Sequence, residues 1–422
     1  MAVRHGYGKI AGTDALVFAY DTGDTRNSYK GEPTENLITN PLPTSTTGFN
    51  RSGGTGTVTY DTIEKAIKWE QTAYSSWGTY FNFHPAFSGT LDTGSQYTFS
   101  LEYKSQNEFA DSLMTHQVVQ GNGQSAATTN TDITSDTYGE VNGWKQYKIT
   151  FTPANSGVSS AYNRFITGNR GTDVLRMWFR NIQFEKKSHK TQFTAGTRSV
   201  SGSLFDLMGN TSIDLTNAGF NSNAQLDFDG TNTYIPKFTD SRFQFADTNL
   251  TYEVVVNFES NPDSYQTLIG LADTNDYIPR INLSKFRSGT GNNGNVGNVY
   301  MQLIDQNGSG TAAGDPDLSG ADLVAGGYYH YVGVVSKPAG SSTYYIYLYR
   351  NGELVETTNS GRTTYDTTQG VQGSIGLAVG TQFGNTQSVL DGQLPVAKVY
   401  NRALTAAEVQ SNYRHYKQRF NL

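Results

Sequence analysis

Short runs in which apolar and polar side chains alternate recur along almost the whole chain, and this period of two limits the fold more than any other feature. Clear examples are "QYTFSLEYK" at 96–104, "GWKQYKITFT" at 143–152 and "TYYIYLYR" at 343–350. Alternation places successive side chains on opposite faces of a strand, so each run can bury one face in a core. The 45 glycines and 27 tyrosines among 422 residues favour short strands joined by many turns. We therefore predict an all-β protein.

A two-residue turn separates two of these alternating runs. In "YYIYLYRNGELVETT" the pair Asn351-Gly352 lies between them. Asn-Gly readily adopts the positive φ angles that tight hairpin turns need. The segment is predicted to be a β-hairpin.

Only the last residues show a helical pattern. In "LTAAEVQSNYRHYKQRF", Thr405 and Glu408 form a capping box, and Leu404 and Val409 are spaced to form a hydrophobic staple beside it. We predict one helix over 405–420, with an apolar stripe that packs on the back of a sheet. The residues of this stripe are Val409, Tyr413, Tyr416 and Phe420.

Charge and cysteine content exclude several kinds of partner. The net charge is −6 without long charge runs, so neither nucleic acid nor an anionic membrane is expected as a partner. There is no cysteine, which excludes disulfides and thiolate metal sites. The first residues, "MAVRHGYGKIAG", lack the apolar core of a secretion signal, and no run approaches the ~20 apolar residues of a membrane span.

The second half of the chain resembles a known module. A D-L-x-G-N turn (206–210), an F-D-G-T-x-x-Y-I pair (228–235), the Asn-Gly hairpin and "YNRALTAAEV" (400–409) follow one another in order. This order is similar to that of concanavalin A-like modules of the laminin-G-like type. The resemblance implies a β-sandwich over 194–422 that ends in the helix.

The first strand of such a module normally lies just before the D-L-x-G-N turn, but here the similar piece, "DALVFAYD", is at 14–21. The simplest interpretation is that 1–34 hold the first strand and a linker, and that a complete domain is inserted after them. Ala15–Tyr20 would then pair with the closing strand, Gly392–Tyr400. The alternative is that the strand belongs to the domain that follows it.

The inserted part, 35–193, resembles the carbohydrate-binding-type jelly rolls of phage virion proteins. It opens with "NLITNP", contains the strand "WKQYKITF" (144–151) and closes with "WFRNIQFEK" (178–186). The resemblance implies two β-sandwiches, a jelly roll within a concanavalin A-like sandwich. It also implies a structural protein of a tailed bacteriophage.

No pattern of catalytic residues accompanies these modules. Glycanases of the concanavalin A-like superfamily use paired carboxylates on alternate strand positions, in an E-x-D-x-x-E-like pattern. The acids near strands here are not paired in that way, and Glu253 is alone in an apolar strand. We therefore expect no enzymatic activity, and we expect Glu253 to face solvent or to be hydrogen-bonded within the sheet.

Metal and glycan sites are the remaining chemical possibilities. No cofactor is required, but structural calcium is common in both resembling families, and "GDPDLSGAD" offers the oxygen ligands Asp315, Asp317 and Asp322. Exposed aromatic rings can stack on sugar rings. The loop-like stretch "TAYSSWGTYFNFH" therefore indicates Tyr74, Trp77 and Tyr80 as glycan contacts, the alternative being that its aromatics fill a core, cover a sheet edge or make a subunit contact.

Together these features predict a non-enzymatic protein on the surface of a virion, made in the host cytoplasm. Its partners would be other virion proteins, further copies of itself and surface glycans. Two alternatives stay open: a receptor-binding tail fibre adhesin, and a glycan-degrading enzyme.

Overall fold

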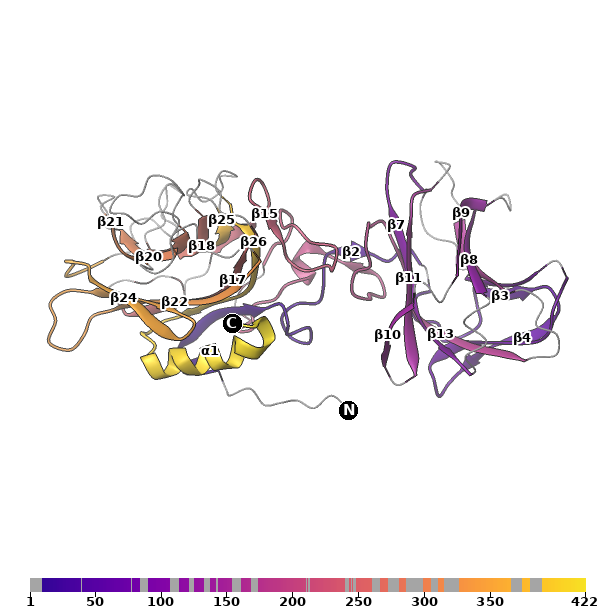
Figure 1. Ribbon diagram of the computed structural model, residues 1–422, viewed down its shortest axis with the longest axis horizontal. Helices are drawn as coiled ribbons and strands as arrows, with labels where there is room; N and C mark the ends of the chain where they lie inside the picture. The colour runs from indigo at the N-terminus through magenta and orange to yellow at the C-terminus, as the bar shows by residue number, and fades with distance from the viewer. Residues whose placement is uncertain are drawn as a thin grey trace. The chain divides into compact units, whose positions relative to one another are not determined.

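The computed structural model consists of β-sheets and one C-terminal helix (Figure 1). It describes residues 10–38, 40–76, 78–83, 90–106, 114–120, 125–132, 137–141, 143–153, 161–167, 174–209, 211, 213–239, 243, 245, 248–259, 266–271, 281–285, 299–304, 310–314, 326–365, 374–379 and 389–422. Every pairing between its named strands is antiparallel. The predicted all-β class with one C-terminal helix is confirmed.

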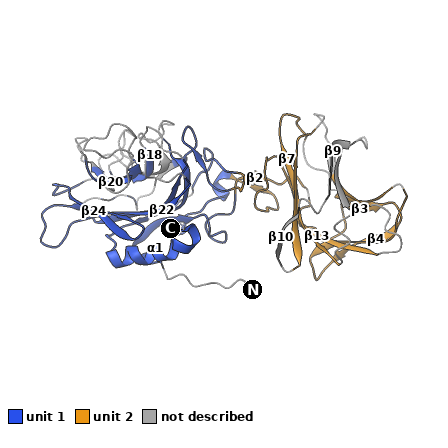
Figure 2. Ribbon diagram, viewed as in Figure 1, with its two compact units in different colours: residues 1–31, 200–221, 225–422 blue, residues 32–199, 222–224 orange. Residues whose placement is uncertain are grey.

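The chain divides into two compact units (Figure 2). The first unit comprises 1–31, 200–221 and 225–422, so it includes both ends of the chain. The second comprises 32–199 together with 222–224. Within the first unit, Lys30 N–H donates to the Ser203 carbonyl at 2.8 Å, and Tyr29 forms a bridge with Leu204. The two points where the chain leaves and re-enters this unit are therefore adjacent.

The first unit is a sandwich of two sheets. In its described part, one sheet has the order β1-β26-β17-β22-β23-β24, with β15 also on β26, and the other has the order β16-β25-β18-β19-β20-β21. Side chains from both sheets form one core, in which Met301 of β20 packs against Gly333 of β22. The strands are β1 (Leu16–Asp21), β15 (Phe228–Asp229), β16 (Ile235–Thr239), β17 (Leu250–Phe258), β18 (Gln266–Leu271), β19 (Ile281–Lys285), β20 (Val299–Ile304), β21 (Gly310–Gly314), β22 (Tyr328–Ser336), β23 (Tyr345–Arg350), β24 (Glu353–Asn359), β25 (Ser374–Val379) and β26 (Asp391–Tyr400). Short 3-10 helices lie at Thr13–Ala15 and Val200–Gly202.

Strand β1 pairs with β26, which is the partner predicted from the sequence. Phe18 lies opposite Val399 and Tyr20 opposite Ala397. Tyr20, which is fully buried, donates its hydroxyl proton to the Leu394 carbonyl at 2.7 Å. The strand therefore belongs to the sandwich of the second half of the chain, and the alternative that it belongs to the following domain is wrong.

The D-L-x-G-N turn fixes the outer edge of β1. The carboxylate of Asp206 accepts hydrogen bonds from Ala19 N–H at 3.1 Å and from Met208 N–H at 3.0 Å. Leu207 N–H donates to the Ala19 carbonyl at 2.7 Å. The turn and the strand are thus neighbours in space although the second unit separates them in sequence.

The second unit is also a two-sheet sandwich. In its described part, one sheet has the order β10-β11-β7-β13-β5-β4, the other has the order β3-β6-β12-β8-β9, and β2 and β14 form a small ribbon. The strands are β2 (Thr34–Glu35), β3 (Phe49–Ser52), β4 (Thr55–Asp61), β5 (Ala66–Ala73), β6 (Thr79–Phe83), β7 (Tyr97–Ser105), β8 (Met114–Gln120), β9 (Ser125–Asp132), β10 (Thr137–Val141), β11 (Trp144–Phe151), β12 (Ala161–Thr167), β13 (Leu175–Glu185) and β14 (Thr197–Arg198).

Aromatic side chains dominate the core of this unit. Phe81 stacks on Trp69 at a centroid distance of 5.3 Å and on Phe179 at 4.9 Å, and Phe83 meets Phe165 edge-on at 4.9 Å. All five side chains are fully buried. Large rings with few rotamers supply much buried area at a small entropic cost, which suits a sandwich without disulfides.

The helix α1 (Ala406–Phe420) covers the outer face of the first unit's β1–β24 sheet (Figure 1). The predicted capping box is confirmed: Thr405 N–H donates to the Glu408 carboxylate at 2.8 Å, and Glu408 N–H donates to the Thr405 hydroxyl at 3.3 Å. Val409 packs against Leu404 and the sheet, and Tyr416 against Val255 and Val396. The predicted Asn351-Gly352 hairpin is also present, with both residues at positive φ.

Because the exit and re-entry points of the first unit are joined by hydrogen bonds, this unit should fold without the second. We expect a chain in which a short glycine-serine linker replaces residues 32–199 to keep its β-sheet circular dichroism and to unfold in one cooperative thermal transition. The control is the full chain measured under the same conditions. A linker variant without a cooperative transition would show that the first unit depends on the second.

Candidate functional site

The structure describes two of the three predicted glycan contacts. Tyr74 follows β5 and packs, half-buried, against the core of the second unit. Tyr80 lies in β6 and is also half-buried, with the guanidinium carbon of Arg164 at 4.4 Å from its ring centroid. Trp77 lies outside the described residues. The glycan contacts of these three rings therefore stay a prediction.

The predicted calcium ligands Asp315, Asp317 and Asp322 also lie outside the described residues. Among the residues that are described, no group of three or more histidine and acidic side chains is arranged to hold a metal ion. Nor does any helix in the described part of the chain have the length and apolarity to cross a membrane. The calcium site therefore stays a prediction.

Glu253, in the middle of β17, is fully buried beneath α1. One carboxylate oxygen accepts a hydrogen bond from the Lys398 ammonium and lies near His330 Nε2, both at 3.1 Å. The other accepts from the Tyr400 hydroxyl at 2.5 Å and from Asn412 Nδ2 at 2.9 Å. Glu253 therefore does not face solvent; it is hydrogen-bonded, and it joins three strands to the helix.

The surroundings of Glu253 decide its ionisation. Burial alone would raise its pKa, but the charge of Lys398 and the hydrogen bond from His330 outweigh burial and hold the pKa well below the usual range. The carboxylate stays ionised, and both of its oxygens already have partners. It therefore has no proton to give to a leaving group and no contact with a substrate.

Two further acids, Asp227 and Glu259, interact near the end of β17. Burial, the charge of Asp227 and a hydrogen bond shared with Asp227 raise the pKa of Glu259, and the charge of Asp391 adds to this effect. Glycosidases separate their two carboxyl groups by about 5 to 9.5 Å so that the scissile bond or a water fits between them. Two directly hydrogen-bonded carboxyl groups leave no such space.

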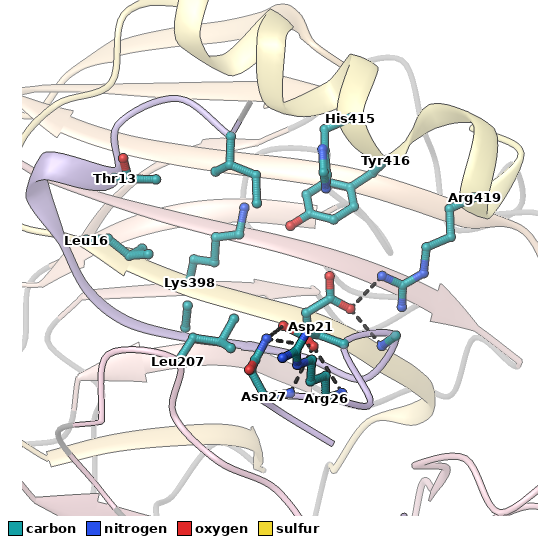
Figure 3. Close-up of a pocket in the computed structure, with 14 residues that line it drawn as sticks. Thr13, Leu16, Asp21, Arg26, Asn27, Leu207, Lys398, His415, Tyr416 and Arg419 are labelled. Atoms are coloured by element: carbon teal, nitrogen blue, oxygen red, sulfur yellow. Dashed lines mark hydrogen bonds and ion pairs between the residues drawn. The ribbon is translucent and has the colours of Figure 1, made fainter. Parts of the chain in front are cut away.

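The first unit contains an open groove of about 820 Å³ beside α1 (Figure 3). Four parts of the chain form it: the segment before β1, β1 with the turn after it, Leu207 of the D-L-x-G-N turn, and β26 with the helix. The residues along it are Ile10, Thr13, Leu16, Ala19, Asp21, Gly23, Asp24, Arg26, Asn27, Leu207, Lys398, His415, Tyr416 and Arg419.

The groove combines an apolar side with a polar end. Leu16 and Leu207 lie on one side in the close-up, and Asp21, Arg26 and Asn27 lie at the end (Figure 3). Asp21 forms an ion pair with Arg419 at 2.5 Å, which ties the last turn of the helix to the loop after β1. This loop is fixed from within, because the Asp24 carboxylate accepts from three donors of Arg26 and Asn27. The Asp21 carboxylate, the Asn27 side chain and the backbone of this loop are thus held in place.

Tyr416 lies at the base of the groove, and its hydroxyl points from the helix toward the cavity (Figure 3). The side chain is fully buried, yet its hydroxyl oxygen has no hydrogen-bond partner among the residues that the structure describes. Burial and the nearby Glu253 and Asp21 charges raise the pKa of Tyr416, so the hydroxyl keeps its proton and can both donate and accept. The Lys398 ammonium lies 4.7 Å from the centroid of the Tyr416 ring.

Sequence reasoning missed this groove because its residues come from distant parts of the chain. The helical stripe correctly placed Tyr416 on the buried face of the helix. The period of a helix does not tell where the end of a buried side chain points. The acidic turn after the first strand, Asp21 to Asp24, does not by itself indicate which other segments will lie beside it.

A family model described as "Concanavalin A-like lectin/glucanases superfamily" matches residues 229–410. This part of the chain forms a concanavalin A-like domain. The match covers less than half of the chain and includes β15 through β26 and the start of α1. Together with β1, these strands form the concanavalin A-like sandwich described above. No curated protein matches the sequence.

Several solved structures match parts of this chain at low similarity. One is the CBM40 of a Ruminococcus gnavus IT-sialidase bound to alpha2,3 sialyllactose, with 15% identity and a TM-score of 0.33 over 44% of this chain and 94% of that one. Another is the botulinum neurotoxin serotype G binding domain, with 16% identity and a TM-score of 0.36 over 50% of this chain and 48% of that one. A SAP-like pentraxin from Limulus polyphemus has 19% identity and a TM-score of 0.32 over 44% and 78%. All three TM-scores are low, so these likenesses say nothing about what this chain binds.

The Glu253 cluster makes a prediction about stability. Glu253→Gln leaves the Lys398 ammonium buried without its counter-charge, which should lower the free energy of unfolding by about 3–5 kcal/mol. Urea unfolding of the full chain measures this change. The control is the double variant Glu253→Gln with Lys398→Met, which removes both charges. It should lower the free energy of unfolding by less than Glu253→Gln alone.

The same comparison has a pH dependence of known sign. The pKa of Glu253 is lower in the folded chain than its ordinary value of 4.5, so its contribution is fully present above that value and declines as the pH falls below it. The stability difference between wild type and Glu253→Gln should therefore shrink in acid. A difference that is independent of pH would contradict an ionised Glu253.

Proposed function

We propose that this protein binds carbohydrate in the groove beside α1, without cleaving it. The observation that carries the proposal is the Tyr416 hydroxyl, which is buried, unpaired and directed toward the groove. Leaving a buried hydroxyl without a partner costs about 1–3 kcal/mol. The hydroxyl oxygen has almost no accessible surface, so a sugar hydroxyl that supplies the missing hydrogen bond has to widen the base of the groove as it binds.

The rest of the groove fits the two kinds of surface that a sugar presents. Leu16 and Leu207 offer an apolar side for the C–H face of a sugar ring. Asp21, Arg26 and Asn27 offer planar polar groups at the end of the groove for its hydroxyls. Because Asp21 is held by Arg419 and the backbone of the Arg26–Asn27 turn by Asp24, binding would order chiefly the Arg26 side chain.

Binding without hydrolysis is supported by the state of the acids. Glu253 is sealed beneath the helix, and Asp227 and Glu259 are hydrogen-bonded to each other. A match to a superfamily that contains both lectins and glucanases is compatible with either activity. The acids described here favour the lectin-like role.

Removing the Tyr416 hydroxyl should weaken carbohydrate binding without changing the stability of the fold. We expect Tyr416→Phe to weaken carbohydrate binding by about fivefold, the value of one lost hydrogen bond. It should not lower the melting temperature, because the hydroxyl has no hydrogen-bond partner in the described part of the chain. A glycan array identifies the ligand for the full chain, and calorimetric titration measures its affinity.

The matched control is Tyr413→Phe on the same helix. Among the described residues its hydroxyl has one hydrogen bond, to the Leu422 carbonyl at 3.5 Å, and Tyr413 does not line the groove. Tyr413→Phe should leave affinity unchanged. Failure of the full chain to retain any carbohydrate, or equal affinities of Tyr416→Phe and wild type, would overturn the proposal.

We propose further that the protein performs this binding on the surface of a tailed phage particle, together with other virion proteins and copies of itself. The support is the similarity of residues 35–193 to jelly rolls of phage virion proteins. Antibodies against the chain should then label intact particles purified from the source of the sequence. Particles that lack the protein by mass spectrometry would contradict this role.

A further inference from the structure

A second cavity of the first unit, about 560 Å³, lies on the other side of α1 from the residues that line the groove. It is a cleft between the helix and the β23–β24 hairpin, and it shares no residue with the groove. The residues along it are Arg350, Asn351, Glu353, Leu354, Val355, Gln410, Tyr413, Arg414 and Lys417. The function of its lining residues therefore has to be considered separately from that of the groove.

The walls of the cleft are fixed. Asn351 N–H donates to the His330 carbonyl at 2.8 Å, and the Asn351 side chain accepts from His330 N–H at 3.0 Å. Gly352 presses so closely on Tyr413 that a Cβ there would come within 2.9 Å of the ring. The hairpin is thus held against both the sheet and the helix, and the cleft exists before any partner arrives.

The cleft is positively charged in a chain whose net charge is −6. Arg350, Arg414 and Lys417 line it, against the single acid Glu353. Among the described residues, neither Arg414 nor Lys417 forms an ion pair with an acid; Lys417 lies 5.5 Å from the Tyr413 ring centroid. The negative end of the helix dipole stabilises cations near the C-terminal end of α1, which could account for Arg414 and Lys417. It does not account for Arg350, which lies on β23, or for the cavity between them.

Two features beside the cations point to a polypeptide. Leu354 lines the cleft with 51% of its surface exposed, which makes it one of the most exposed large apolar side chains in the described part of the chain. It belongs to β24, which ends the order of its sheet and pairs, among the described strands, with β23 alone. An edge strand offers free backbone groups to an extended segment, and alternate side chains of that segment then reach one side.

We propose that this cleft docks an extended, acidic segment of another protein. The segment would lie along β24, place acidic side chains on Arg414 and Lys417, and place an apolar side chain on Leu354. A sulfated polysaccharide would satisfy the charges but would not use Leu354. The proposal is independent of carbohydrate binding in the groove.

The test uses the full chain and a labelled synthetic peptide in which glutamate alternates with valine, followed by fluorescence anisotropy. The glutamate peptide should bind, and the same peptide with lysine in place of glutamate should not. The double variant Arg414→Gln with Lys417→Gln should bind the glutamate peptide at least about tenfold more weakly. Leu354→Ser should weaken it by a smaller factor.

Gln418→Glu is the matched control, because Gln418 is exposed on the same last turn but does not line the cleft. It lowers the charge of that turn by one, as Lys417→Gln does, and should leave peptide binding unchanged. Melting temperatures of all variants show whether each is folded.

Three results would overturn the proposal: no binding of the glutamate peptide, equal binding by the double variant, or binding that Gln418→Glu weakens as much as the double variant. Heparin serves as the competing probe. If heparin binds, the double variant loses it and the glutamate peptide does not bind, the cleft takes a sulfated polysaccharide and the peptide proposal is wrong.

Discussion

The position of α1 depends on one buried carboxylate. Placing the charge of Glu253 beneath a helix is costly unless every lone pair finds a donor, and here the donors come from β22, β26 and the helix itself. Asn412 extends the connection further, since its carbonyl oxygen accepts from Ala11 N–H at 2.7 Å. A single charge therefore fixes the helix and the segment that precedes β1. Any rotation of the helix would leave several of these groups without partners.

Fixing the helix also fixes the two cavities on either side of it. Tyr416 and Arg419 face the groove, whereas Tyr413 and Lys417 face the cleft. Residues three or four apart on a helix lie on the same side of it. One side of α1 therefore lines the groove and another side lines the cleft. The helix is thus more than a cover for the sheet. The buried network holds it in place, and its flanks carry the groups available to ligands.

The fold could be predicted from local patterns because each pattern has a local cause. Alternation determines which face of a strand is buried, and the Thr405–Glu408 box determines where the helix begins. The β1–β26 pairing could be predicted only because the order of motifs indicated a missing first strand. The candidate site was not predictable in this way. Nothing near Glu253 in the sequence indicates that His330, Lys398 and Asn412 will surround it, and the unpaired Tyr416 hydroxyl exists only once the helix is docked.

The pairing of β1 with β26 also determines the order in which the chain can mature. β1 is made before the second unit, and its partner β26 is made after it. The second unit lies between them in sequence and has its own aromatic core, so it can fold on the ribosome before β26 is made and β1 can pair. During that time the apolar side chains of β1, including Phe18 and Tyr20, have no core to enter. The hydrogen-bonded closure of the first unit therefore has to follow the synthesis of the second unit and of β26.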